Sequence, residues 1–201
     1  MSIAEDTILV EMRSFLEGLE DDRVESFLDG FGWTVEPRVL EPATLACRRH
    51  LPQAVEAAAS RVQNLAARLA KAAGSLRWAQ TYTAADFGDE FLGGYGWCEI
   101  FGARGHFKSM EMAGGFLLLG PRLTYPDHRH VAEEIYVPLT GGTEWRMGDG
   151  DFALRDACEV IHHTSNVSHA MRTGSAPLLA LYLWRGGPLD QRSDIGVRSH
   201  S

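Results

Sequence analysis

Residues 120–141 read GPRLTYPDHRHVAEEIYVPLTG and bring imidazole, carboxylate and phenol side chains close together in the chain. His128 and His130 are separated by one residue, Glu134 follows four positions later, and Tyr136 lies two beyond that. Side chains two apart on a β-strand point to the same face. We therefore expect these four side chains to share one face of a strand.

The spacing of these residues also predicts a bend. In a straight strand, His128 and Glu134 would lie roughly 20 Å apart, because a strand rises about 3.3 Å per residue. A metal ion holds its ligand atoms about 2 Å away, so a shared ion requires the chain to fold back between His130 and Glu134. A further histidine, His169, is available downstream in the stretch HHTSNVSHAMRT, residues 162–173. We predict one divalent-metal site here; the competing interpretation is a polar strand with surface histidines.

The composition is that of an ordinary globular protein, with 201 residues, 45% of them hydrophobic and 23% charged. The net charge of −8 argues against a nucleic-acid partner, which requires a basic surface. The three cysteines lie far apart, without a metal-binding or disulfide pattern. The N-terminus lacks the features of a signal peptide and no stretch approaches the ~20 apolar residues of a membrane span. We expect a cytoplasmic protein with no membrane partner.

Helical periodicity dominates the first part of the chain. Apolar residues recur at helical spacing over residues 5–19 and 24–31, and a short helix is expected over 44–51. A longer helix is predicted from Pro52 to Ala73, with proline at its first position. These segments carry no cluster of catalytic residue types, so residues 1–75 are interpreted as a helical N-terminal region that serves as a cap or an interface.

The pattern changes after Gly74, where short apolar runs alternate with glycines and turn signals recur every eight to twelve residues. Residues 76–82 and 91–102 are two such runs, and residues 148–151 (GDGD) are a hairpin signal. Many short strands without alternating helices predict a mainly β domain over residues 76–201, arranged as an antiparallel sandwich or barrel such as a jelly roll.

The spacing of the first motif resembles that of the cupin superfamily. That motif comprises a glycine, two histidines in HxH, a glutamate and a second glycine, and it is matched here by Gly120, His128, His130, Glu134 and Gly141. The gap after the first glycine is seven residues, where five is usual. The resemblance implies that the helical N-terminal region is followed along the chain by a cupin double-stranded β-helix, which is a jelly-roll barrel.

The second cupin motif is degraded. Of its usual residues only His169 remains, so His162 and His163 stay open as rival ligands, although His169 is favoured by its position after the turn. Three imidazoles and one carboxylate suit borderline ions, namely Zn²⁺, Fe²⁺, Mn²⁺, Co²⁺ or Ni²⁺, and the ligand types do not choose among them.

A finer match is to bacterial cupin-type dimethylsulfoniopropionate (DMSP) lyases. The chain resembles them in the HxHxxxExY string, in Tyr125 five residues before the second histidine, and in the helical region ahead of the barrel. The resemblance implies metal-dependent β-elimination of DMSP to dimethyl sulfide and acrylate, with a tyrosine as general base. Tyr136 is the expected base, because it shares a face with Glu134 and a nearby cation favours the phenolate; Tyr125 is the second candidate.

A sulfonium group, like a quaternary ammonium group, favours a box of aromatic side chains. The candidates for this box are Tyr125, Trp145, Tyr182 and Trp184, all in the β half. The alternative role for Trp145 and Trp184 is ordinary core packing. The expected partner is a small sulfonium molecule, and the chain is expected to be a monomer or a homodimer.

Other functions remain open from the sequence. A cupin dioxygenase would use the same three-His, one-Glu site to hold iron. A non-catalytic regulatory cupin would carry a basic helix-turn-helix, which the acidic N-terminal helices do not resemble. A sugar-phosphate isomerase would use a basic cluster, for which Arg122, Arg129 and Arg146 are available. His50, His106 and His200 have no companions in the sequence and are expected at the surface.

Overall fold

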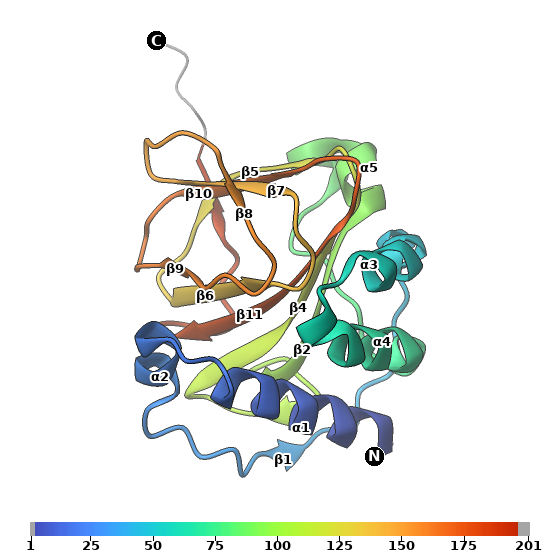
Figure 1. Cartoon of the computed structure of the whole chain (residues 1–201), viewed down its shortest axis with the longest axis vertical. Helices are drawn as coiled ribbons and strands as arrows, with labels where there is room; N and C mark the ends of the chain where they lie inside the picture. Colours follow the sequence, from blue (N-terminus) through green and yellow to red (C-terminus); the bar gives the residue numbers. More distant parts are fainter. Residues whose placement is uncertain (1–2, 197–201) are drawn as a thin grey trace.

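The computed structural model describes residues 3–196, in which two β-sheets face one another and helices cover the outer side of the larger sheet (Figure 1). The seven-stranded sheet has the order β1-β3-β2-β4-β11-β6-β9, and the five-stranded sheet the order β12-β5-β10-β7-β8. All pairings are antiparallel except that between β2 and β3. This jelly-roll barrel behind N-terminal helices is the fold class expected from the sequence.

The strands of the seven-stranded sheet are β1 (Glu36–Pro37), β2 (Tyr95–Gly102), β3 (Phe107–Lys108), β4 (Met112–Leu119), β6 (Glu133–Pro138), β9 (Ile161–His163) and β11 (Leu178–Arg185). Those of the five-stranded sheet are β5 (Thr124–Arg129), β7 (Thr143–Met147), β8 (Ala153–Arg155), β10 (His169–Thr173) and β12 (Asp194–Ile195). The helices are α1 (Ile3–Glu17), α2 (Asp22–Leu28), α3 (Leu51–Ala57), α4 (Gln63–Ala72), α5 (Ala84–Gly94) and the 3-10 turns η1 (Ala46–His50) and η2 (Ser60–Val62).

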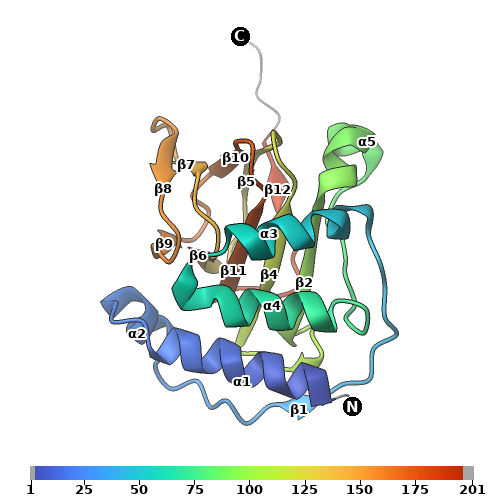
Figure 2. The same cartoon turned by 45° about the vertical axis from the view of Figure 1, so that its right-hand side comes forward.

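Helices α1, α3 and α4 form a layer in front of strands β2, β4 and β11, as Figure 2 shows most clearly. The apolar stripe of α1, with Ile8, Met12 and Leu16 at helical spacing, is completely buried. It belongs to a core that also contains Ile100 and Leu181 from the outer face of the sheet. The helical region therefore shares one hydrophobic core with the barrel.

The single long helix expected over residues 52–73 is wrong. Helix α3 ends at Ala57, and Ala58 and Ala59 adopt extended backbone before η2 and α4 begin. The amide of Ala59 donates to the carbonyl of Leu139, and Ala58 forms a bridge to Thr140. These hydrogen bonds to the barrel interrupt the helix, a tertiary effect that the Ala-rich periodicity does not reveal.

The strands expected from residues 76–82 and 91–94 are also wrong. Residues 76–82 make only isolated bridges, whereas Phe91–Gly94 complete helix α5. Thr83 and Asp86 form a capping box at the start of α5, a signal that the sequence carries but that apolar runs alone do not show. Helices therefore continue beyond residue 75, and the two-residue strand β1 lies within the N-terminal region.

Strand β6 follows the predicted alternation. Glu134 and Tyr136 point into the barrel, and Ile135 and Val137 belong to the core beneath the helices. The chain also folds back as expected, because β5 ends at Arg129 and β6 starts at Glu133.

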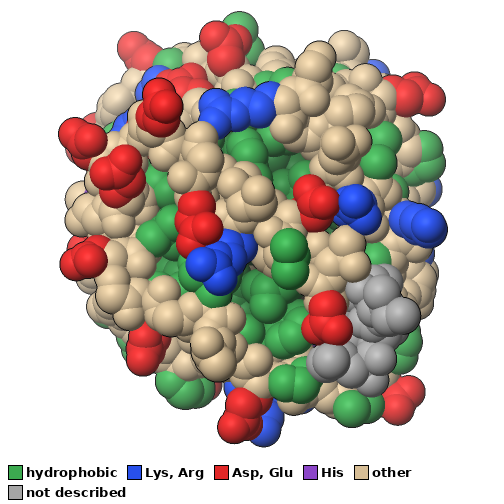
Figure 3. All heavy atoms as spheres, turned by 60° about the horizontal axis from the view of Figure 1, so that its bottom comes forward, with side chains coloured by type: hydrophobic (Ala, Val, Ile, Leu, Met, Phe, Trp, Pro, Cys, Tyr) green, Lys and Arg blue, Asp and Glu red, His purple; other side chains and the backbone are tan. Residues whose placement is uncertain are grey.

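Within residues 3–196, no helix has the length and apolarity that a bilayer crossing needs. Figure 3 shows the end of the molecule near α1, where acidic and basic side chains are interspersed over apolar surface.

Candidate metal centre and active site

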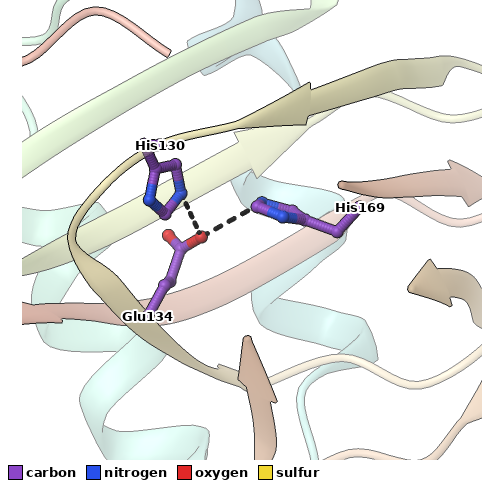
Figure 4. Close-up of side chains that lie close together, drawn as sticks. All are labelled: His130, Glu134 and His169. Atoms are coloured by element: carbon purple, nitrogen blue, oxygen red, sulfur yellow. Dashed lines mark hydrogen bonds and ion pairs between the residues drawn. The ribbon is translucent and has the colours of Figure 1, made fainter. Parts of the chain in front are cut away.

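Three side chains meet at the centre of the barrel (Figure 4). Oε2 of Glu134 lies 2.9 Å from Nε2 of His130 and 3.2 Å from Nε2 of His169. One ligand atom from each residue lies within 4.8 Å of the others, and all three residues are almost completely buried. The bend after β5 brings His130 opposite Glu134, and β10 supplies His169 from the facing sheet.

His128 lies beside this trio. Its ring centroid is 4.1 Å from that of His169 and 6.4 Å from that of His130, and it is 2% exposed. It is not one of the three residues whose ligand atoms gather within 4.8 Å. The structure thus brings three of the four predicted ligands together and places the fourth next to His169.

Backbone carbonyls orient the three histidines. Nδ1 of His128 donates to Pro126 (2.9 Å), Nδ1 of His130 to Ala132 (2.8 Å), and Nδ1 of His169 to Val167 (3.1 Å). A carbonyl only accepts, so each Nδ1 carries the proton and each Nε2 keeps its lone pair when the ring is neutral. This arrangement is the usual one around metal-binding histidines.

The two rival histidines, His162 and His163, lie on opposite sides of the sheet. His162 points outward and pairs with Glu133 at 2.9 Å. His163, on β9 opposite Glu134, is 1% exposed; its ring stacks on His169 at 4.0 Å, and its Nδ1 lies 3.8 Å from Oε2 of Glu134. His163 is thus an additional imidazole at the cluster, whereas His162 is remote from it.

The electrostatics favour a charged carboxylate among imidazoles. Burial alone would raise the pKa of Glu134, but the charge and hydrogen bond of His130 outweigh it and hold that pKa well below its usual value. Burial also lowers the pKa of His128 well below its usual value, which keeps the ring neutral. Burial opposes a charge on His130, but the charge of Glu134 outweighs it and raises the pKa of His130, so an ion bound here would take the place of the proton on this ring. A carboxylate with imidazole nitrogens is a donor set that suits a borderline divalent ion.

A cavity opens beside the cluster and is lined by His128, His130 and Glu134. Aromatic side chains make up much of its remaining wall: Tyr95, Trp97, Tyr125, Tyr136, Tyr182 and Trp184. Arg104 is the one Lys or Arg among its lining residues. The cavity therefore offers aromatic faces around a charged centre.

Three of the four aromatic residues predicted for a sulfonium box line this cavity, and Trp145 does not. Trp145 is 3% exposed and its ring packs against Tyr136 at 5.1 Å. It lies between the two sheets, as the other three do, but packs against Tyr136 and is not on the cavity wall. The parity of a strand position does not distinguish these two places.

The sequence reasoning missed other aromatic residues that line the cavity or contact its wall. Tyr95 and Trp97 follow the inward parity of β2, so alternation could have identified them. Tyr82 could not be found that way, because it lies outside the strands; its hydroxyl is 2.9 Å from that of Tyr125.

His106, expected at the surface, is 2% exposed and accepts a hydrogen bond from the Arg77 amide. His50 is partly buried, and His200 lies outside the described residues.

Burial raises the pKa of Tyr136 well above its usual value, and the charge of Glu134 acts in the same direction. Burial does the same for Tyr125, whose hydroxyl also lies near those of Tyr82 and Tyr95. Either tyrosine therefore needs a compensating positive charge before it can serve as a base.

Comparisons with known proteins place the chain in a family. Residues 34–180 match the family model described as dimethylsulfoniopropionate lyase. The chain is 35% identical over 124 residues to the DMSP lyase DddQ of Ruegeria pomeroyi, an alignment that covers 57% of this chain and 58% of that protein. It is 32% identical over 127 residues to the putative DMSP lyase DddL of Cereibacter sphaeroides, covering 62% and 52%. The chain thus spans little more than half the length of these two relatives.

Two solved structures are similar over nearly the whole chain. A crystal structure from a study of the DMSP lyases RdDddP and RnDddQII superposes with a TM-score of 0.88 at 27% identity, over 96% of this chain and 97% of that one. The crystal structure of DddQ from Ruegeria pomeroyi gives a TM-score of 0.90 at 22% identity, with both chains fully covered, and supports the fold.

Proposed function

Since the chain belongs to the dimethylsulfoniopropionate lyase family, we propose that it cleaves DMSP by β-elimination to dimethyl sulfide and acrylate. The observation that carries this proposal is the buried cluster of His130, Glu134 and His169, with Tyr136 two residues beyond Glu134 on the same face of β6. The lyase names of its relatives support the same reaction class.

We assign His128, His130, Glu134 and His169 to one divalent ion, which is Zn²⁺, Fe²⁺, Mn²⁺, Co²⁺ or Ni²⁺. The three Nε2 atoms, each on a ring held through Nδ1, and the charged carboxylate support this assignment. When bound, the ion would supply positive charge that polarises the substrate carboxylate and favours the phenolate of Tyr136.

Tyr136 is the proposed base. Its oxygen takes the proton from the carbon next to the substrate carboxylate; the electron pair of that C–H bond forms the carbon–carbon double bond of acrylate. The C–S bond breaks, and its electron pair leaves with dimethyl sulfide. The cavity position of Tyr136 supports this role, and Tyr125, on the same cavity wall, is the second candidate.

The aromatic cavity wall is proposed to hold the sulfonium group. A cation over an aromatic face is stabilised by about 0.5–2 kcal/mol, more when water is excluded. Tyr125, Tyr182 and Trp184 serve this purpose from the predicted set, and Tyr95 and Trp97 extend the wall. Trp145 supports Tyr136 from behind.

The decisive experiment is headspace gas chromatography for dimethyl sulfide after metal-loaded protein is mixed with DMSP under argon. We expect dimethyl sulfide and acrylate in equal amounts, and the exclusion of oxygen separates the lyase from a cupin dioxygenase. Protein stripped with a chelator and the Glu134→Gln variant are the controls. Metal-loaded protein that releases no dimethyl sulfide above these controls would contradict the proposal.

A further inference from the structure

The two oxygens of the Glu134 carboxylate have different surroundings. Oε2 faces Nε2 of His130 and of His169, at 2.9 and 3.2 Å. Oε1 accepts a hydrogen bond of 2.6 Å from Nε1 of Trp184. The indole N–H is a donor only, so it contacts Glu134 equally well with or without an ion at Oε2.

We propose that Trp184 is a positioning residue of the metal centre, which holds Glu134 through Oε1 so that Oε2 alone is presented to the ion. The inference rests on the proposed metal site and adds to it a residue outside the ligand set. It assigns Trp184 a role separate from contact with the sulfonium group.

Strand pairing makes this contact rigid. Trp184 on β11 lies directly opposite Glu134 on β6 in the sheet register. Their neighbours Leu183 and Ile135 form the next pair in the register and are fully buried in the core beneath the helices. A shift of either strand by one residue would move those apolar side chains out of the core. The register thus holds the two side chains next to each other on the inner face of the sheet.

The same indole also touches a second proposed ligand. Its ring centroid lies 4.1 Å from that of His130, with the ring planes at 32°. Trp184 therefore contacts both residues that flank the bend between β5 and β6. The ring fixes His130 by packing, and the N–H fixes Glu134 by a hydrogen bond.

Trp184 differs from the other groups that orient the ligands. The histidines are held by backbone carbonyls of Pro126, Ala132 and Val167, which a side-chain substitution does not remove. The hydrogen bond to Oε1 comes from a side chain, so a single substitution can delete it. Loss of such an outer hydrogen bond usually costs 10–100-fold in metal affinity.

The test is the Trp184→Phe variant, which keeps an aromatic ring and deletes the N–H. Affinity for Zn²⁺ and Co²⁺ is measured on metal-free protein by competition with a chromophoric chelator, without substrate. We expect a dissociation constant about 10–100-fold higher than that of the wild type. The absorption spectrum of the Co²⁺ protein should also change, because Glu134 is then free to bind through both oxygens.

Trp145→Phe is the matched control. Trp145 also lies inside the barrel and is 3% exposed, whereas Trp184 is only partly buried. The Nε1 of Trp145 makes no hydrogen bond in the structure. We expect this variant to keep the wild-type metal affinity and Co²⁺ spectrum. Thermal unfolding of both variants reports whether the fold survives each loss of ring area.

The outcomes are distinct. Unchanged affinity and spectrum in Trp184→Phe would overturn the inference, and so would an equal loss in Trp145→Phe, which would indicate general packing. A wild-type protein that binds neither ion would overturn it together with the metal site. A wild-type protein that binds the ions with the expected dependence on Trp184, but releases no dimethyl sulfide, would contradict only the proposed lyase function.

Discussion

The two faces of the seven-stranded sheet are built from the same strands, yet they differ in almost every chemical property. The outer face contributes residues such as Ile100, Ile135 and Leu181 to a core shared with the helices. The inner face contributes Glu134, Tyr136 and other cavity residues. Successive side chains of a strand alternate between faces. Along β6, one residue therefore packs in the core and stabilises the fold, and the next faces the cavity. The comparison predicts opposite consequences for neighbouring substitutions.

The largest effect is expected for Glu134→Gln, compared with Glu133→Gln one residue away. Glu134 faces the imidazoles, whereas Glu133 pairs with His162 on the outside. A neutral amide is a poor substitute for the carboxylate, so Glu134→Gln should lose the metal and reduce turnover to the level of metal-free protein. Glu133→Gln should keep both. Metal analysis and dimethyl sulfide release check this, and full metal occupancy in Glu134→Gln would refute the ligand assignment.

Next in size is Tyr136→Phe, which deletes one hydroxyl from the inner face. Removal of a general base typically costs a factor of 10² to 10⁴ in rate, about 3–5 kcal/mol of barrier. The ring remains, so fold and metal content should survive while kcat falls by that factor. A metal-loaded variant that keeps more than about a tenth of the wild-type kcat would show that Tyr136 is not the base, and Tyr125 would be tested next.

Ile135→Ala tests the outer face at the adjacent position. Ile135 is fully buried beneath the helices. Truncation of such a side chain costs about 2–5 kcal/mol in the free energy of unfolding. We expect that loss in urea denaturation, with kcat per metal-loaded folded molecule close to the wild type. A fall in kcat as large as that of Tyr136→Phe would break the separation between the two faces.

Acid should destabilise the protein because His163, a buried histidine on the inner face, resists protonation. Burial lowers the pKa of His163 to about 4, and the charge of His169 adds to this effect. An unfolded histidine titrates near 6.5, so the unfolded state binds the proton first as the pH falls. The stability linked to the neutral His163 ring is fully present above pH 6.5 and decreases as the pH falls to about 4. Between pH 7 and pH 5 the free energy of unfolding should therefore fall by about 2 kcal/mol.

The measurement is urea unfolding of metal-free protein at pH 7 and pH 5. The loss of unfolding free energy between the two should be smaller in His163→Gln by about 2 kcal/mol. Ile135→Ala should show the same pH-dependent loss as the wild type, because it removes no titratable group. An undiminished loss in His163→Gln would mean that this ring does not stay neutral in the fold.

The smallest effect is expected for Tyr82→Phe. The Tyr82 hydroxyl lies 2.9 Å from that of Tyr125 and helps to orient it. Loss of one such hydrogen bond costs about 1 kcal/mol, about fivefold in an equilibrium constant. We expect KM for DMSP to rise by that factor with kcat nearly unchanged. A drop in kcat comparable to that of Tyr136→Phe would instead make Tyr125 a participant in proton transfer.

Whether the sequence predicts a feature depends on how far apart along the chain the residues that determine it lie. The alternation of Glu134, Ile135 and Tyr136 is a local property of one strand, and the jelly-roll class follows from many short strands. The break at Ala58 and Ala59 depends on hydrogen bonds to a segment some eighty residues later, which periodicity cannot report. The contacts of Tyr82 and His163 likewise depend on how separate segments meet. Trp145 and Trp184 have the same strand character, and only the packing distinguishes them.

The origin of the candidate ligands on separate strands has a thermodynamic consequence. His130 follows β5, Glu134 lies on β6 and His169 on β10, so the three meet only when both sheets have assembled. An ion that binds this cluster binds the native state and not the unfolded chain. At a free ion concentration of 100 times the dissociation constant, it would add about 2.7 kcal/mol to the free energy of unfolding. The melting temperature of the protein would then depend on the concentration of free metal in its surroundings.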